Sequence, residues 1–131
     1  MSDRRPTILV VDQDPTEGAV TALLLRTAFP SMAVLTATRG DEAQERANAL
    51  LDADPCAELL LIAEFVLPDD DSGLRLIGRL ETREDDRIAF VLFTQSRNPR
   101  LKEICKERLI IHFHKRDEQE QLLTFFHALL D

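Results

Sequence analysis

The sequence predicts an α/β fold: a doubly wound (βα)5 chain that forms a three-layer α/β/α sandwich around a five-stranded parallel sheet. Two observations lead to this prediction. Short apolar runs alternate with amphipathic segments along the whole chain, which indicates strands and helices in turn. Alternating units of this kind form parallel strands joined by right-handed crossovers. The length of 131 residues fits one domain, so we expect a single domain over residues 1–131.

Each expected strand is a short apolar run. TILVV, residues 7–11, is apolar on both faces, as in a strand that helices cover on both sides. The most hydrophobic run is 58–66, and we expect the central strand in its first half. The remaining strands are expected within residues 32–37, 87–94 and 109–113.

The amphipathic segments are expected to be helices over residues 14–29, 40–52, 74–82, 98–108 and 117–130. Asp14, Pro15 and Glu17 fit the N-cap, the first-position proline and the acid of a capping box. Asp117 and Glu120 have the spacing of a second capping box. On the first helix, the apolar residues at helical spacing are Val20, Leu23, Leu24 and Ala28.

The composition argues against several classes of function. A net charge of −8 disfavours sequence-independent binding to nucleic acid, which requires clustered Lys and Arg. No apolar run approaches the roughly 20 residues of a membrane span, and no hydrophobic signal core follows the opening MSDRRPT. We therefore expect a cytoplasmic protein that contacts another protein rather than nucleic acid or a membrane.

Polar residues follow the expected strands at the edge where the carboxyl ends of parallel strands meet. They are Asp12, Gln13 and Asp14 after the first strand, Glu64 at the end of the third, Thr94 at the end of the fourth, and Lys115 after the fifth. An acidic cluster, a hydroxyl and a lysine at one edge are typical of phosphoryl transfer. In such sites acids hold Mg²⁺, one carboxylate accepts the phosphoryl group, and the lysine and hydroxyl bind its oxygens.

These stretches resemble the receiver domain of two-component response regulators, the CheY-like family, and the resemblance covers essentially the whole chain. ILVVDQDP resembles the opening strand and acidic pair, LLLIAEFVLPDDDSG the phosphoacceptor strand and loop, VLFTQS the switch Thr or Ser, and HFHK the closing lysine. The resemblance implies a flavodoxin-like strand order of 2-1-3-4-5. It also implies a receiver domain, here without an effector domain, whose partner is a sensor kinase or a downstream signalling protein.

Several positions depart from the pattern of that family. The acidic pair falls on Asp12 and Gln13, and the phosphoacceptor position falls on Glu64. Thr94 and Lys115 fit the switch and phosphate-binding positions, whereas the aromatic switch position falls on His112.

Two of these departures affect the chemistry directly. Glu64 is one methylene longer than Asp, and a nucleophile misplaced by about 1 Å can lose roughly 100-fold in rate. The same extension brings a negative charge toward Lys115 and Thr94, which would imitate the phosphorylated state. Gln13 removes one charge from the metal site. We therefore expect a degenerate pseudo-receiver that acts as an interaction module, with no catalytic residue and no cofactor beyond weak Mg²⁺ binding at Asp12 and Glu64.

Two alternatives remain open. One is a phosphorylatable single-domain response regulator with a weak site. The other is a phosphatase of the haloacid-dehalogenase type, because residues 12–16 match D-x-D-x-T and because Thr94 and Lys115 would supply its later hydroxyl and lysine. That class needs a further acidic pair on a strand after the lysine, whereas only a helix is expected after Lys115.

The last helix offers a candidate interaction surface. Its apolar residues span roughly 160° of its circumference at about 100° per residue, more than one sheet face requires. Complete burial of the helix is one explanation. The other is a partner or homodimer surface formed with the fourth helix, to which Leu122, Phe125 or Leu129 would contribute. In the preceding strand, His112 and His114 lie on one face, and we expect a switch-position ring and a surface imidazole.

Overall fold

Five strands form one parallel sheet in the computed structural model, which describes residues 6–130. The ends of the predicted domain, residues 1–5 and 131, lie outside the described residues. The sheet order is β2-β1-β3-β6-β7, which confirms the predicted order. The strands are β1 (Thr7–Val11), β2 (Val34–Ala37), β3 (Leu59–Ala63), β6 (Ile88–Thr94) and β7 (Ile111–His114), with the short β4 (Val66–Leu67) and β5 (Asp71–Ser72) outside this sheet.

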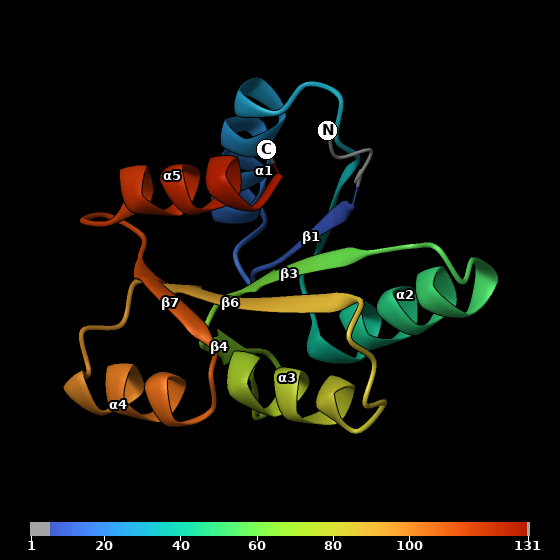
Figure 1. The fold of residues 1–131 in the computed structure, drawn as a ribbon. Coiled ribbons are helices and arrows are strands. Elements are labelled where there is room, and N and C mark those ends of the chain that lie inside the picture. The colour runs from blue at the N-terminus through green and yellow to red at the C-terminus, as the bar shows by residue number, and fades with distance from the viewer. Residues whose placement is uncertain (1–5, 131) are drawn as a thin grey trace.

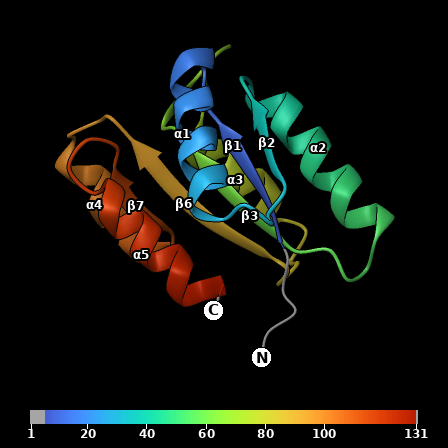
Figure 2. The same cartoon turned by 90° about the horizontal axis from the view of Figure 1, so that it is seen from above.

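Helices cover both faces of the sheet and give the three predicted layers (Figures 1 and 2). On one face lie α1 and α5, and on the other lie α2, α3 and α4. Their bounds are α1 (Pro15–Ala28), α2 (Gly40–Ala53), α3 (Gly73–Glu81), α4 (Pro99–Glu107) and α5 (Gln119–Leu130). Between residues 6 and 130, no helix has both the length and the apolar character needed to cross a membrane.

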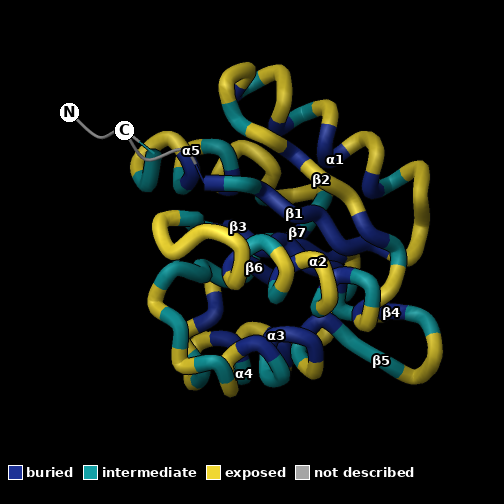
Figure 3. The backbone as a smooth tube through the Cα atoms, turned by 90° about the vertical axis from the view of Figure 1, so that its right-hand side faces the viewer, coloured by how far each residue is buried: buried dark blue, intermediate teal, exposed yellow. Residues whose placement is uncertain are grey.

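Each face of the sheet has its own hydrophobic core, because successive side chains of a strand point to opposite faces. In β1, Ile8 and Val10 pack with residues of α1 and α5, whereas Leu9 and Val11 pack with residues of α2 and α3. All of β3 is buried, as expected of a central parallel strand. Figure 3 shows the resulting pattern, with buried strands enclosed by helices whose outer faces are exposed.

A short antiparallel hairpin, formed by β4 and β5, follows β3 where the sequence predicted only a loop. Asp69 and Asp70 at its tip have φ values of 63° and 57°, a left-handed conformation that Asp tolerates better than most residues. Gly73 closes the hairpin: its N–H donates to the Phe65 carbonyl at 2.8 Å. A Cβ at this position would lie 2.4 Å from the carbonyl oxygen of Glu64. Only glycine therefore allows the backbone to approach the end of β3 so closely.

Two boundaries near the C-terminus differ from the prediction. β7 begins at Ile111 rather than at residue 109, because Leu109 has a φ of 58° and is 91% exposed. The helix α5 begins at Gln119, so the predicted capping box at Asp117 is wrong. Instead, the Asp117 carboxylate accepts a hydrogen bond from Arg97 at 2.8 Å.

The buried face of α1 also differs from the prediction. Val20 and Leu23 are 53% and 63% exposed, whereas Ala22 and Leu25 are fully buried. The helix carries apolar residues around much of its circumference, so helical spacing alone does not identify the side that faces the sheet.

We expect Leu25→Ala to lower the free energy of unfolding by about 2–5 kcal/mol, because it leaves a cavity in a closely packed core. Leu23→Ala, the matched control on the same helix, should change it by less than about 0.5 kcal/mol. Urea denaturation followed by circular dichroism measures both changes. Equal losses for the two variants would contradict this assignment of the buried face.

Candidate functional site

A cavity of about 360 Å³ opens at the carboxyl edge of the sheet. Its walls come from the ends of β1, β3 and β6, as predicted for a parallel sheet. The lining residues are Asp12, Gln13, Asp14, Glu64, Val66, Thr94, Gln95 and Ser96. The structure therefore brings together the predicted site residues of three strands, and Lys115, after β7, binds two of them.

Lys115 lies between two carboxylates. Its Nζ donates to Oδ2 of Asp12 and forms an ion pair with Oε2 of Glu64 at 2.9 Å. All three side chains are buried: 7% of Lys115, 4% of Asp12 and 10% of Glu64 is exposed. Burial alone would lower the pKa of Lys115, but its hydrogen bonds to Asp12 and Glu64 outweigh burial and raise the pKa above its ordinary value. The lysine is therefore a positively charged centre shared by two acids.

The Glu64 carboxylate accepts hydrogen bonds at both oxygens. Oε1 accepts from the Thr94 hydroxyl and, at 2.7 Å, from the backbone N–H of Phe65. Oε2 accepts from the Gln95 N–H at 3.3 Å, in addition to its ion pair with Lys115. These donors satisfy a buried carboxylate, which would otherwise carry a large desolvation cost. The extended side chain of Glu64 does reach Thr94 and Lys115, as its length led us to expect.

Asp14 has a structural position at the rim of the cavity. Its Oδ1 accepts from the N–H groups of Thr16 and Glu17 at 2.9 and 3.3 Å, which confirms the predicted N-cap of α1. The other half of the predicted capping box is absent, because the Glu17 carboxylate accepts from the Gln95 side chain at 2.9 Å. The Asp14 N–H donates to Oδ1 of Asp12 at 3.0 Å, so the cap also orients the first acid of the site. Gln13 between them is exposed.

Gln95 is a site residue that the prediction left without a role. Its N–H donates to Glu64, its side chain donates to Glu17, and its carbonyl oxygen lies 3.1 Å from Nε2 of His114. The sequence pointed to Gln95 only through its position directly after Thr94 at a strand end. Contacts made by backbone N–H and carbonyl groups cannot be predicted from the type of residue.

The resemblance implies a divalent cation at this edge, but the donor set does not suit one. Oδ1 of Asp12 is taken by the Asp14 N–H, and the remaining oxygen Oδ2 by Lys115. Oε2 of Glu64 faces the same ammonium group, and Gln13 offers only a neutral amide. Within residues 6–130, no group of three or more His, Cys, Asp or Glu side chains is arranged to hold a metal ion.

Comparison with known structures identifies the fold. A LuxR-family DNA-binding response regulator from Staphylococcus aureus superposes with a TM-score of 0.76 at 12% identity, over 96% of this chain and 99% of that one. The chemotaxis protein CheY4 from Vibrio cholerae gives 0.73 at 20% identity, over 97% and 100%. A response regulator receiver protein from Burkholderia phymatum gives 0.71 at 20% identity, over 96% and 95%.

The chain has the receiver fold. No family model and no curated protein matches the sequence significantly. The likeness therefore rests on structure, and it agrees with the resemblance drawn from the strand-end residues.

The two histidines of β7 lie in different surroundings in this receiver fold. His114 is 7% exposed and not the predicted surface imidazole, because Nδ1 accepts from the N–H of Arg116 at 3.2 Å while Nε2 faces the Gln95 carbonyl. Both ring nitrogens of His112 are buried without a hydrogen-bond partner among the described residues. Burial lowers the pKa of His112 below its ordinary value.

The predicted interaction surface on α5 needs one correction. Leu122 is fully buried against the sheet, so it cannot contribute to a surface contact. Phe125 and Leu129 are half-buried and pack at the margin of the same core. Complete burial therefore explains the inner part of this wide apolar face, and only its margin is accessible.

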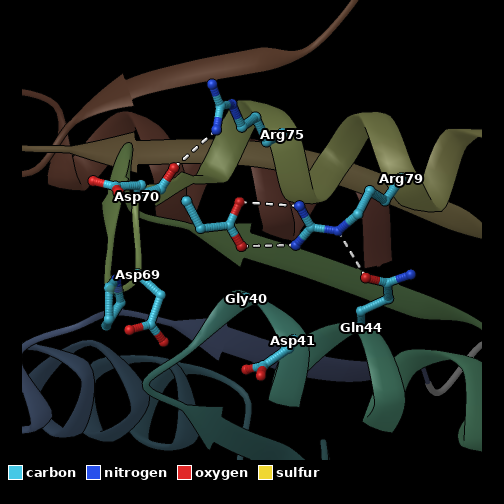
Figure 4. A pocket seen from close by; sticks show the side chains of 9 residues that line it. Gly40, Asp41, Gln44, Asp69, Asp70, Arg75 and Arg79 are labelled. Carbon is cyan, nitrogen blue, oxygen red and sulfur yellow. Dashed lines mark hydrogen bonds and ion pairs between the residues drawn. The ribbon is translucent and has the colours of Figure 1, made fainter.

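A second cavity, of about 340 Å³, lies between the first turn of α2, the hairpin and α3 (Figure 4). Several of the charged residues that line it or lie beside it form pairs. Arg79 donates two hydrogen bonds to Asp71, at 3.0 and 2.7 Å, and a third to Gln44 at 2.7 Å. The bonds from Arg79 lower the pKa of Asp71, and Arg39 forms an ion pair with Asp69 at 3.2 Å. These contacts fasten the hairpin to α2 and α3.

His112, half-buried with both ring nitrogens buried, gives a prediction for pH dependence. Because its pKa is lowered in the folded protein, the unfolded chain binds the proton more readily. The free energy of unfolding should therefore decrease as the pH falls through about 6.5. Charges on Lys102 and His114 add to this effect, and Glu118 opposes it.

His112→Phe should reduce this dependence of the free energy of unfolding on pH. Thermal or urea denaturation between neutral and mildly acidic pH measures it. The control is His127→Gln, which replaces an exposed histidine on α5 and should keep the slope of the wild type. An unchanged slope in His112→Phe would refute the assignment.

Proposed function

We propose that this chain is a signalling module with the receiver fold that transmits information through protein contacts and does not run a phosphorylation cycle. The observation that carries the proposal is the Glu64 carboxylate, held between the Thr94 hydroxyl and the Lys115 ammonium. In phosphoryl transfer, a hydroxyl and a lysine bind the oxygens of the phosphoryl group. Here a permanent carboxylate takes that place.

The geometry of Glu64 opposes its use as a nucleophile. An attacking carboxylate needs a free oxygen in line with the phosphorus atom, whereas Oε1 and Oε2 each accept from two donors. Attack would require breaking buried hydrogen bonds to an ionised group, which are among the stronger ones in proteins. The carboxylate also carries the negative charge that phosphorylation would otherwise add, so this part of the fold stays in one state.

A surface on α4 and β7 is suited to a protein partner. A cavity of about 460 Å³ is lined there by Lys102, Cys105, Lys106, Ile110, Ile111 and His112. Beside it, Leu109 is 91% exposed. The basic lining residues of the cavity are the exposed Lys102 and Lys106, in a chain of net charge −8. An apolar cavity with a basic rim favours an acidic protein surface that carries an apolar side chain, and a second copy of this acidic chain meets the charge requirement.

We expect no phosphoryl adduct when the wild type is incubated with acetyl phosphate and Mg²⁺, and no bound beryllofluoride when it is incubated with a beryllofluoride salt and Mg²⁺. Intact mass spectrometry and NMR provide the measurement. The matched variant is Glu64→Asp combined with Gln13→Asp, which shortens the nucleophile and restores an acidic pair. This double variant should gain Mg²⁺ binding and a phosphoryl adduct. A stable adduct on Glu64 of the wild type would instead identify a working, weak receiver.

We expect the wild type to self-associate through the α4–β7 surface as concentration rises, more strongly at low salt. Leu109→Asp should shift the equilibrium toward the monomer, because it places a charge beside the apolar cavity. Sedimentation velocity over a concentration series measures the effect. Leu23→Asp, at an apolar position on α1 that is 63% exposed, serves as control, and a loss of association in that variant instead would place the surface on α1.

A further inference from the structure

We infer that Arg26 and Arg46 block the edge of the sheet at β2, so that a second copy of this chain cannot add its own β2 there. The sheet has two edge strands, β2 and β7, at its opposite sides (Figure 2). An edge strand is a template for pairing with another chain unless its main-chain groups are covered. Neither arginine has a part in the proposed function, and β2 lies at the edge remote from the α4–β7 surface.

The outer side of β2 presents the main-chain groups of Val34 and Thr36. In a parallel sheet, alternate residues of a strand direct their N–H and C=O groups toward the same neighbouring strand. The Ala37 carbonyl accepts from the Asp12 N–H, at the end of β1, at 3.0 Å. The odd-numbered residues of β2 therefore face β1, and the even-numbered residues face away from the sheet.

A guanidinium group from each helix layer binds one of these outward carbonyls. Arg26, in the last turn of α1, donates from Nη2 to the Val34 carbonyl at 2.7 Å. Arg46 lies on α2, which covers the opposite face of the sheet, and donates from Nη1 to the Thr36 carbonyl at 3.0 Å. Both outward carbonyls of β2 are thus taken by side chains that reach the edge from its two sides.

The strand itself carries nothing that would deter pairing. Its residues, VLTA, are uncharged and are either apolar or β-branched, and Leu35 is 41% exposed. An exposed apolar edge of this kind is a site of association between chains, and proteins commonly protect such edges with charged side chains. Here the protecting charges come from the neighbouring helices instead of from the strand.

Pairing of β2 with the β2 of a second copy would use the carbonyls that the arginines bind. With a two-fold axis at Leu35, Val34 of one copy lies opposite Thr36 of the other, and each such pair exchanges two N–H···O=C bonds. The same register brings Arg26 of one copy beside Arg46 of the other, and opposed like charges destabilise a strand pair. The edge therefore opens to a second copy only when the guanidinium groups are removed.

The test uses a Leu109→Asp background, in which the proposed α4–β7 contact is weakened, so that the two kinds of association remain distinguishable. Adding Arg26→Met and Arg46→Met should produce a dimer whose dissociation constant is at least about tenfold lower than that of Leu109→Asp alone. Sedimentation velocity over a concentration series measures this constant. In the dimer, hydrogen exchange followed by NMR should slow at the N–H groups of Val34 and Thr36, which would then be hydrogen-bonded.

Three further variants separate strand pairing from changes in overall charge and in apolar surface. Adding Leu35→Lys to the methionine pair should restore the monomer, because it places like charges opposite each other at the axis. Arg75→Met with Arg100→Met makes the same charge change at exposed positions on α3 and α4 and should leave the dissociation constant unchanged. Arg26→Gln with Arg46→Gln adds no apolar surface and should dimerise as the methionine pair does. The glutamine pair also replaces the methionine pair should the latter fail to fold.

A folded variant that lacks both guanidinium groups and associates no more tightly than Leu109→Asp alone would overturn the inference. A dimer that persists with Leu35→Lys, or that leaves exchange at Val34 and Thr36 unchanged, would also overturn it, because such a dimer uses another surface. Failure of the proposed function has a different signature, a phosphoryl adduct on Glu64 of the wild type.

Discussion

The contacts of Lys115 hold together the functional edge of this sheet. The residue follows β7, and its ammonium group binds Asp12 after β1 and Glu64 after β3, while Thr94 at the end of β6 donates to the same Glu64. Four strands therefore meet at one charged cluster. Removing one partner of a buried ion pair typically costs about 3–5 kcal/mol, since a charge is left unpaired. The backbone N–H groups of Asp14, Phe65 and Gln95 donate further hydrogen bonds to the two carboxylates.

The sheet and the convergence of the site were predictable because they depend on patterns with a fixed period. Runs such as residues 7–11 and 59–63 are apolar on both faces, as is typical of a parallel strand covered by helices. Residues after such strands must lie at one edge. The orientation of α1 was not predictable in the same way: with apolar residues around much of the helix, the tertiary packing of Leu25 rather than spacing decides which side is buried.

Other features depend on single torsions or on backbone atoms, which residue types do not encode. The hairpin tip at Asp69 and Asp70 and the late start of β7 after Leu109 each use a positive φ in a residue other than glycine. The role of Gln95 comes largely from its N–H and carbonyl groups. Whether Glu64 reaches Lys115 depends on a rotamer, so the sequence indicated the approach of the two charges without establishing their contact.

If the chain runs no phosphorylation cycle, as proposed, its regulation would have to come from binding elsewhere, because the charges of the Lys115 cluster are satisfied within the cluster. The route is short. His112 lines the cavity on α4 and β7, His114 two residues later faces the Gln95 carbonyl, and Lys115 follows directly. A partner that displaces β7 at the cavity would therefore also move the ammonium group that joins Asp12 and Glu64. A signal would then pass from this surface to the cluster of Asp12, Glu64 and Lys115, with β7 as the connecting element.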